Sequence, residues 1–186
     1  MKKIKRALIS VSNKQNLNKL LSILKKYNIE IISSGGTFKE IKKLGYKCTE
    51  VSNYTNSPEI LGGRVKTLHP KIHGGILNVR SNKTHQKEIK ENEFGKIDLV
   101  IVNFYPFEKI IQSSNNHDKI IENIDIGGPT LVRSAAKNFK YVTVITNPDQ
   151  YSELIKQMRF LNGGTSFGFR KKLSSEAFSD TSYYDS

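Results

Sequence analysis

The chain has 186 residues and a formal net charge of +13, with 30 Lys and Arg against 17 Asp and Glu. Its length suits one domain with a sizeable core, and its single cysteine, Cys48, excludes a disulfide framework within the chain. No apolar stretch approaches the ~18 residues of a membrane span, and the apolar run after Arg6 is too short for a signal peptide. We therefore expect a reduced, cytoplasmic compartment and no membrane partner.

Strand and helix patterns alternate along the chain. Apolar runs predict strands at 7–9, 29–32, 47–51, 98–103 and 141–145. Helical spacing and capping signals predict helices at 15–27, 37–44, 83–93, 118–124 and 129–138, another beginning at Pro148, and a last one at 166–182. This alternation predicts an α/β protein with three layers, α/β/α, around a central and mainly parallel sheet.

A long segment, residues 52–78, interrupts this pattern. It is rich in Gly, Pro and basic residues, and its only clear regular signal is the apolar run Ile76-Leu77. Loops of this length inside compact domains are uncommon and usually functional or disordered. We therefore expect a functional loop here.

Polar segments follow the predicted strands, which is where ligands bind in open parallel sheets. Ser12-Asn13-Lys14 and Ser34-Gly35-Gly36-Thr37 each occupy a strand-to-helix turn, and Asn13 is also a possible helix N-cap. Glycine backbone N–H groups, hydroxyls and a helix N-terminus together favour an anion. Each turn alone is also typical of an ordinary helix start, but two adjacent turns indicate a phosphate site.

The densest segment is Gly62 to Pro70. Arg64 is suited to bidentate anion binding. Lys66 lies two residues on, so an extended backbone would point both side chains to one side. Thr67 adds a donor. We interpret this segment as part of a binding site rather than as a basic surface loop.

A metal site is a weak prediction. His69 and His73 have the i, i+4 spacing of a ligand pair on a helix. However, Pro70 and Gly74-Gly75 argue against a regular helix there, and no cysteine or carboxylate lies close by in the sequence. We expect no metal.

Two later segments carry further candidates. Asn103-Phe104-Tyr105 follows the apolar strand, and the Tyr105 phenol is either packed at the strand end or a proton relay. Asp125-Ile126-Gly127 opens a helix of small residues that carries Lys137. Such a helix favours a lysine buried or held in a cleft, where it could transfer protons, although a solvent-facing lysine is the simpler interpretation.

These segments resemble one family. The motifs that carry the resemblance are SVSNK at 10–14, SSGGT at 33–37, LGGRVKTLHP at 61–70, NFYPF at 103–107, and DIGGPT at 125–130 continuing to Lys137-Asn138. They are similar to the cyclohydrolase half of the bifunctional purine enzyme that pairs AICAR transformylase with inosine monophosphate (IMP) cyclohydrolase. Five motifs in order, covering essentially the whole chain, make this resemblance specific. Asn13 departs from it, because the family often has aspartate there.

The resemblance implies a methylglyoxal-synthase-like fold and a substrate, formamidoimidazole carboxamide ribotide (FAICAR), which is converted to IMP and water. It implies no cofactor, since 10-formyltetrahydrofolate would serve only the transformylase, and a homodimer. The implied nucleotide-binding residues are Ser12, Asn13, Lys14, Ser34, Gly35, Gly36, Thr37, Arg64, Val65, Lys66, Thr67, Asn103, Phe104, Asp125, Ile126 and Gly127. Lys137 takes the family's proton donor and acceptor role, with Lys66, Tyr105 and Asp125 assisting.

Three alternatives remain open. A methylglyoxal synthase would bind a triose phosphate, but it needs a carboxylate base near the phosphate turn, and the Ser34 turn holds none. A regulatory nucleotide-binding module, like the allosteric domain of carbamoyl phosphate synthetase, would not need Lys66, Asp125 and Lys137 together. Nucleic-acid binding rests on charge alone, and the evenly spread lysines favour a solvated surface.

The family enzyme continues into a larger transformylase domain. We expect residues 1–186 to form the cyclohydrolase domain, with residues 166–186 a C-terminal helix leading toward that second domain. The chain would then be an excised domain or a short form, without formyl transfer of its own.

Overall fold

A parallel sheet forms the centre of the molecule. The computed structural model describes residues 1–105, 107–113 and 115–186, apart from the side chains of 108–110. Within these residues five parallel strands are arranged in the order β4-β3-β2-β5-β6. They are β2 (Arg6–Val11), β3 (Glu30–Ser33), β4 (Thr49–Glu50), β5 (Leu99–Asn103) and β6 (Thr143–Ile145). The apolar side chains of the central strands, such as Leu8 and Val100, are fully buried, as expected of strands covered on both faces.

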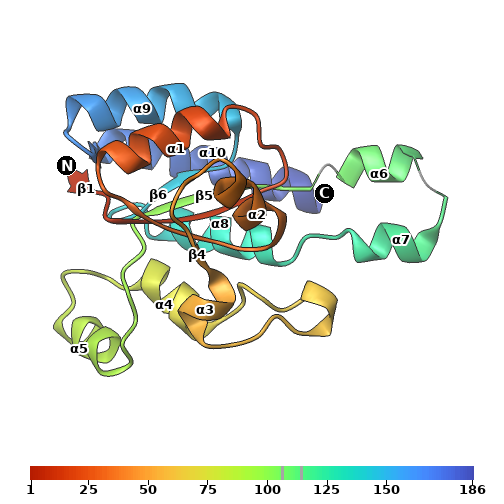
Figure 1. Ribbon diagram of the computed structural model, residues 1–186, viewed down its shortest axis with the longest axis horizontal. Helices are drawn as coiled ribbons and strands as arrows, with labels where there is room; N and C mark the ends of the chain where they lie inside the picture. The colour runs from red at the N-terminus through yellow and green to blue at the C-terminus, as the bar shows by residue number, and fades with distance from the viewer. Residues whose placement is uncertain (106, 114) are drawn as a thin grey trace.

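Helices cover both faces of this sheet, which confirms the predicted α/β class. Helices α1 (Leu17–Lys26) and α9 (Tyr151–Phe160) pack together on one side, and α8 (Gly127–Lys137) lies on the other (Figure 1). Helix α10 (Phe167–Asp185) packs against α8 and β6, and α2 (Gly35–Lys43) packs against β2 and β3. Helix α5 (Lys83–Glu91) is exposed, as predicted. A short antiparallel pair, β1 (Lys2–Lys3) and β7 (Gly164–Thr165), joins the N-terminal residues to the segment before α10 and was not predicted.

The prediction of a loop at 52–78 is wrong for much of its length. The segment contains α3 (Val51–Thr55), the 3-10 turn η1 (Leu61–Gly63) and the helix α4 (Pro70–Leu77). The glycines of α4 mark close packing rather than a turn. A Cβ on Gly74 would lie 2.8 Å from the Phe94 ring, and one on Gly75 would lie 2.5 Å from the Gly95 carbonyl oxygen.

Three other predicted boundaries shift. The strand at 47–51 shortens to Thr49–Glu50, and the helix at 37–44 begins earlier, at Gly35. Asn13 does not cap α1, which begins at Leu17 with Asn16 at its N-cap. Two short helices, α6 (Phe107–Ser113) and α7 (His117–Glu122), extend away from the body (Figure 1). The pattern predicted the second of these but not the first.

Helix α10 is anchored by a buried arginine. Arg170, 2% exposed, donates hydrogen bonds to the carbonyl oxygens of Phe139 (2.9 Å), Lys140 (3.2 Å) and Thr165 (2.7 Å). Phe139 and Lys140 follow the C-terminal end of α8, where a cation is favoured. The predicted final helix is therefore part of the folded body, and it runs to Asp185.

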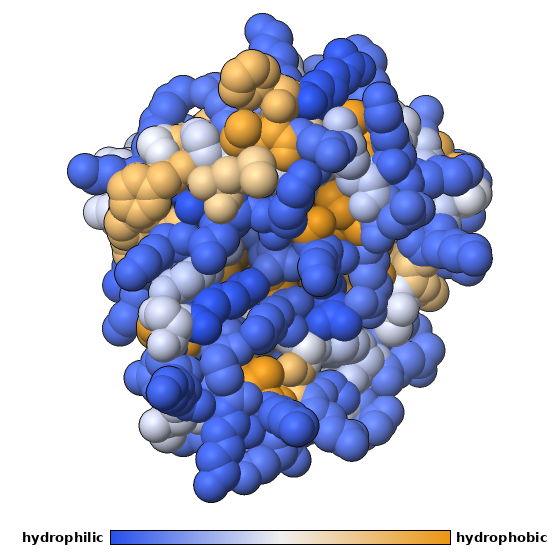
Figure 2. Space-filling view, turned by 90° about the vertical axis from the view of Figure 1, so that its left-hand side faces the viewer, coloured by the Kyte–Doolittle hydropathy of each residue, from blue (hydrophilic) through white to orange (hydrophobic). Residues whose placement is uncertain are grey.

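The surface is largely hydrophilic on the side where the N-terminus lies (Figure 2). Apolar residues gather in the upper part of that view, toward α9. The exposed apolar side chains of the described residues include Met1 and Phe160. Within the described part of the chain, no helix combines the length and apolar character that crossing a bilayer requires.

Candidate active site at the carboxyl edge of the sheet

The candidate residues gather mainly at the carboxyl edge of the sheet, where β2, β3 and β5 end. The turn after β2 is held by Asn103, the last residue of β5. Its side-chain oxygen accepts the backbone N–H groups of Ser12 (2.7 Å) and Asn13 (2.9 Å), and its nitrogen donates to the Asn13 carbonyl oxygen (2.9 Å). The Asn103 side chain, predicted to contact the substrate base, is therefore engaged with this turn. Lys14 is exposed beside the turn and donates to the Ser12 carbonyl oxygen (3.3 Å).

The turn after β3 forms the N-terminus of α2. Ser34 is the N-cap and makes no capping hydrogen bond with its side chain, and Gly35 has a positive φ of 54°. The Thr37 hydroxyl, predicted to serve the ligand, instead accepts the Val11 N–H (2.9 Å) and donates to the Val11 carbonyl oxygen (3.0 Å). What this turn offers an anion is its backbone, because the N–H groups of a first helical turn, here Gly35 to Thr37, have no partner within the helix.

Lys66 brings a cation to this helix end. Gly35 has no side chain, and a Cβ added there would lie 3.5 Å from the Lys66 Nζ. The same Nζ lies 3.0 Å from Oε1 of Glu59. The Lys66 side chain is 29% exposed. A small hollow lies here, and its lining residues are Ser34, Glu50, Ser52, Ser57, Glu59 and Lys66. Two carboxylates that are distant in the sequence thus lie beside Ser34, which the sequence did not predict.

Arg64 does not join Lys66, so the prediction that both side chains point to one side is wrong. Arg64 has helical backbone angles, φ −62° and ψ −30°, because it ends the turn η1. Its guanidinium binds the carboxylate of Glu122 on α7, and this pairing lowers the pKa of Glu122. Between the two cations, Val65 forms an isolated antiparallel bridge with Ile60.

Thr67 and His73 lie where α4 meets α8. Thr67 is buried, and its Oγ1 lies 2.9 Å from the Cβ that a residue other than glycine would place at 127. His73 Nδ1 lies 3.1 Å from the Ser134 hydroxyl oxygen, and burial lowers the pKa of His73. His69 caps α4 by accepting the Lys71 N–H. Among the residues that the structure describes, no cluster of His, Cys, Asp and Glu could hold a metal ion.

Asp125 lies directly before Ile126, the N-cap residue of α8. Its Oδ1 accepts the Gly128 N–H (2.8 Å), and its own N–H donates to the Tyr184 hydroxyl oxygen (2.8 Å). Burial raises the pKa of Asp125 above its ordinary value. Gly127 follows at the helix start, and Ile126 between them is 60% exposed. A carboxylate and the first N–H groups of a helix therefore adjoin Thr67.

Aromatic side chains border this end of the site. The ring centroids of Phe104 and Tyr184 lie 4.9 Å apart, and Tyr105 is 53% exposed. Pro106, in the same motif, lies outside the described residues. Tyr184, from α10, is another residue that the sequence did not single out. Its only local signal was a helical pattern ending near position 182.

Lys137 lies elsewhere, so the prediction of a lysine buried or held in a cleft is wrong. It is exposed at the last residue of α8, whereas Gly127 begins that helix at the carboxyl edge. Ten residues of helix separate the two by about 15 Å, since each residue rises 1.5 Å. The next residue, Asn138, donates to the Ile76 and Asn78 carbonyl oxygens at the opposite edge of the sheet.

Known proteins share this sequence and fold. The family model "MGS-like domain" matches residues 16–130, and the model "AICARFT/IMPCHase bienzyme" matches residues 135–186. Proteins named "Bifunctional purine biosynthesis protein PurH" are similar to nearly the whole chain. The one from Persephonella marina is 48% identical over 98% of this chain, and the one from Rhizobium rhizogenes is 44% identical over 98%. The chain spans 35% and 34% of those two proteins, about a third of their length.

A solved structure matches the whole fold. The protein titled "Crystal structure of ForH" superposes with a TM-score of 0.86 at 30% sequence identity, covering 98% of this chain and 95% of that one. The fold therefore occurs in a chain of similar extent.

Proposed function

The chain belongs to the MGS-like domain family, and from that premise we infer that it is an IMP cyclohydrolase domain, which closes the second purine ring of FAICAR to give IMP. The observation that carries this proposal is the Lys66 ammonium beside Gly35 at the N-terminus of α2, while the next residue, Thr67, lies against Gly127 at the start of α8. There Asp125 accepts the Gly128 N–H. The names of the PurH relatives support a role in purine biosynthesis.

The substrate phosphate suits the turns after β2 and β3. The backbone N–H groups of Gly35, Gly36 and Thr37, the hydroxyls of Ser12 and Ser34, and the Lys14 ammonium would hold it. Asn103 and the Thr37 hydroxyl act indirectly in this proposal, because they fix the two turns through backbone hydrogen bonds. Asn13 belongs to the same phosphate turn, and Phe104 and Ile126 remain predicted contacts to the base. The other predicted substrate-binding residues, which would line the site, are Arg64, Val65, Thr67 and Gly127.

The ring closure needs proton transfer and stabilisation of an oxyanion more than it needs two reactants to be brought together. The carboxamide nitrogen attacks the formyl carbon, and a C–N bond forms within one molecule, so proximity is already supplied. Water then leaves with the formyl oxygen, one carboxamide hydrogen and the hydrogen of the formamido nitrogen. The enzyme must stabilise the oxyanion that precedes this loss.

We assign three residues to this task. Lys66 would polarise and protonate the formyl oxygen, with Tyr105 assisting. Asp125 would orient the carboxamide and accept its proton, and burial favours this role because it raises the pKa of that carboxyl toward neutrality. These roles are proposals for the site as a whole.

Lys137 can take part only from a second chain. It lies at the far end of α8 from Gly127, further than a lysine side chain extends. We therefore include a homodimer in the proposal, with Lys137 of one copy serving the site of the other, and we keep the cytoplasm as the expected location.

An ultraviolet assay of the purified chain with FAICAR tests the proposal by following IMP. We expect turnover, and we expect Lys66→Ala to lower kcat at least ~100-fold, the scale of a lost general acid. The matched control is Lys87→Ala, an exposed lysine on α5 that pairs with Glu91, which should leave kcat unchanged.

Other outcomes would assign other functions. Tight IMP binding without turnover would indicate a regulatory module. Turnover of a triose phosphate would indicate a methylglyoxal synthase, but Glu59, a carboxylate beside Ser34, is ion-paired with Lys66 and is a poor candidate for a free base. Near-normal kcat in Lys66→Ala would remove Lys66 from the mechanism.

A further inference from the structure

Tyr184 connects the end of the chain to two segments of the candidate site. Its hydroxyl oxygen accepts the backbone N–H of Asp125 at 2.8 Å. Its ring packs against Phe104, with centroids 4.9 Å apart and planes tilted by 47°, and more loosely against Phe107, at 6.2 Å. One side chain therefore ties the segment after β5 to the segment before α8.

Among the residues that the structure describes, the other hydrogen bonds of the Asp125 segment lie within its own stretch of chain, from the Ile124 N–H to the Ile121 carbonyl oxygen and from Thr130 to the Ile126 carbonyl oxygen. The flanking residues Ile124 and Ile126 are 42% and 60% exposed, so apolar packing does little to fix this backbone. The Asp125 carboxylate is held by the Gly128 N–H, within its own turn. The Tyr184 hydroxyl is the contact that joins the Asp125 backbone to a different element, α10.

The chemistry of Tyr184 suits a fixed contact. Burial raises its pKa, so the phenol stays neutral throughout the neutral pH range and its hydrogen bond from the Asp125 N–H does not change with pH there. Helix α10 is rigidly seated, because Arg170 and several apolar side chains are buried along it. The hydroxyl is thus presented from a fixed support.

We propose that Tyr184 is a positioning residue for Asp125, so that the cyclohydrolase site is complete only when the last turn of α10 is in place. This inference rests on the proposed function. It extends the site beyond the span that the MGS-like domain model matches, which ends at residue 130.

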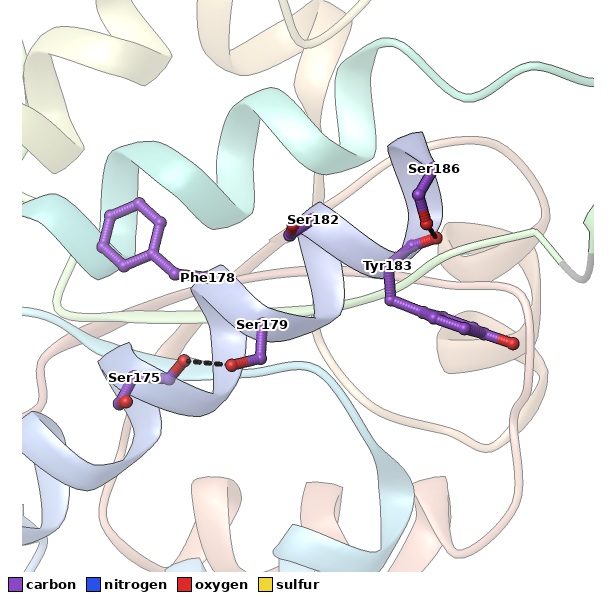
Figure 3. A pocket seen from close by; sticks show the side chains of 6 residues that line it. All are labelled: Ser175, Phe178, Ser179, Ser182, Tyr183 and Ser186. Atoms are coloured by element: carbon purple, nitrogen blue, oxygen red, sulfur yellow. Dashed lines mark hydrogen bonds between the residues drawn. The ribbon is translucent and has the colours of Figure 1, made fainter.

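The test compares Tyr184→Phe with Tyr183→Phe in the full chain. The first variant removes the accepting oxygen and keeps the ring against Phe104. The second removes the hydroxyl of the adjacent tyrosine, which lines a separate hollow on α10 with Ser179 and Ser182 (Figure 3). Two kinds of measurement are made on each variant: steady-state kinetics, which give kcat and KM for FAICAR, and the hydrogen-exchange rate of the Asp125 amide by NMR.

We expect Tyr184→Phe to lower kcat roughly fivefold with little change in KM, since one hydrogen bond contributes about 1 kcal/mol. The Asp125 amide should exchange at least about fivefold faster, because its partner is gone. Tyr183→Phe should leave kcat, KM and the exchange rate at wild-type values.

Two results would overturn the inference: an unchanged exchange rate in Tyr184→Phe, or faster exchange with wild-type kcat. If the wild-type chain makes no IMP, the proposed function fails separately. Exchange of the Asp125 amide with and without bound IMP then decides the inference. Protection by IMP that is lost in Tyr184→Phe supports it, and equal protection in both proteins refutes it.

Discussion

Several polar side chains at the carboxyl edge bind the protein's own backbone and so shape the site. Asn103 saturates the Ser12-Asn13 turn with three hydrogen bonds, and Thr37 makes two with Val11. A residue type suited to ligands thus serves equally well as a brace, because both tasks use the same donors and acceptors. Sequence alone could place these residues near the site but could not separate the two roles.

We expect the Asp125 carboxyl to control how the activity depends on pH. Burial raises the pKa of this carboxyl, and the proposed base must be deprotonated. Activity should therefore fall on acidification through a pKa above that of an ordinary aspartate. Asp125→Asn keeps an oxygen to accept the Gly128 N–H, so it should fold. Its kcat should drop at least ~100-fold, and the fall of kcat at low pH should disappear. A pH profile of kcat for both proteins checks this. If kcat of Asp125→Asn still falls at low pH, the titrating group is a residue other than Asp125.

At the scale of elements, α4 depends on glycines that the sequence pattern takes for turn signals. A Cβ at position 75 would lie 2.5 Å from the Gly95 carbonyl oxygen, a backbone atom that cannot move aside cheaply. We expect Gly75→Ala to reduce the free energy of unfolding by about 1–3 kcal/mol, the usual scale of overpacking. Thermal unfolding measures the change. Gly168→Ala in α10 is the control, because a Cβ there meets nothing within 4 Å. It should leave the protein as stable or up to ~1 kcal/mol more stable, and equal losses in the two variants would contradict the packing argument.

The sequence predicts the elements that local periodicity determines and misses those that depend on residues distant in the chain. The central strands and most helices follow from local periodicity, because each buries a continuous run or one face. Helix α4 does not, because what stabilises it lies at Phe94 and Gly95, distant in the sequence. The length of β4 is also set by pairing with another part of the chain. Thr49 and Glu50 pair with β3 at one edge of the sheet, and the predicted strand does not extend beyond these two residues.

At the scale of the whole molecule, the site is built from pairs that no local pattern encodes. Glu122 is 58 positions from Arg64, and Tyr184 is 59 positions from Asp125. The strand ends were predicted because a parallel sheet collects them at one edge. The partners that orient Arg64 and Asp125 were not, since only the folded chain brings them together.

The position of Lys137 predicts that two inactive variants restore activity when they form a mixed dimer. If each site takes Lys137 from the partner copy, Lys66→Ala and Lys137→Ala should each abolish turnover, yet a mixed dimer would carry one site with both residues intact. Random mixing gives half mixed dimers, so refolding the two variants together should restore about a quarter of wild-type kcat. Mixing each variant with more of itself is the control, and size-exclusion chromatography establishes the dimer. If Lys137 acted within its own chain, both sites of the mixed dimer would be damaged and mixing would restore nothing. The position of Lys137, at the opposite end of α8 from Gly127, favours the first result.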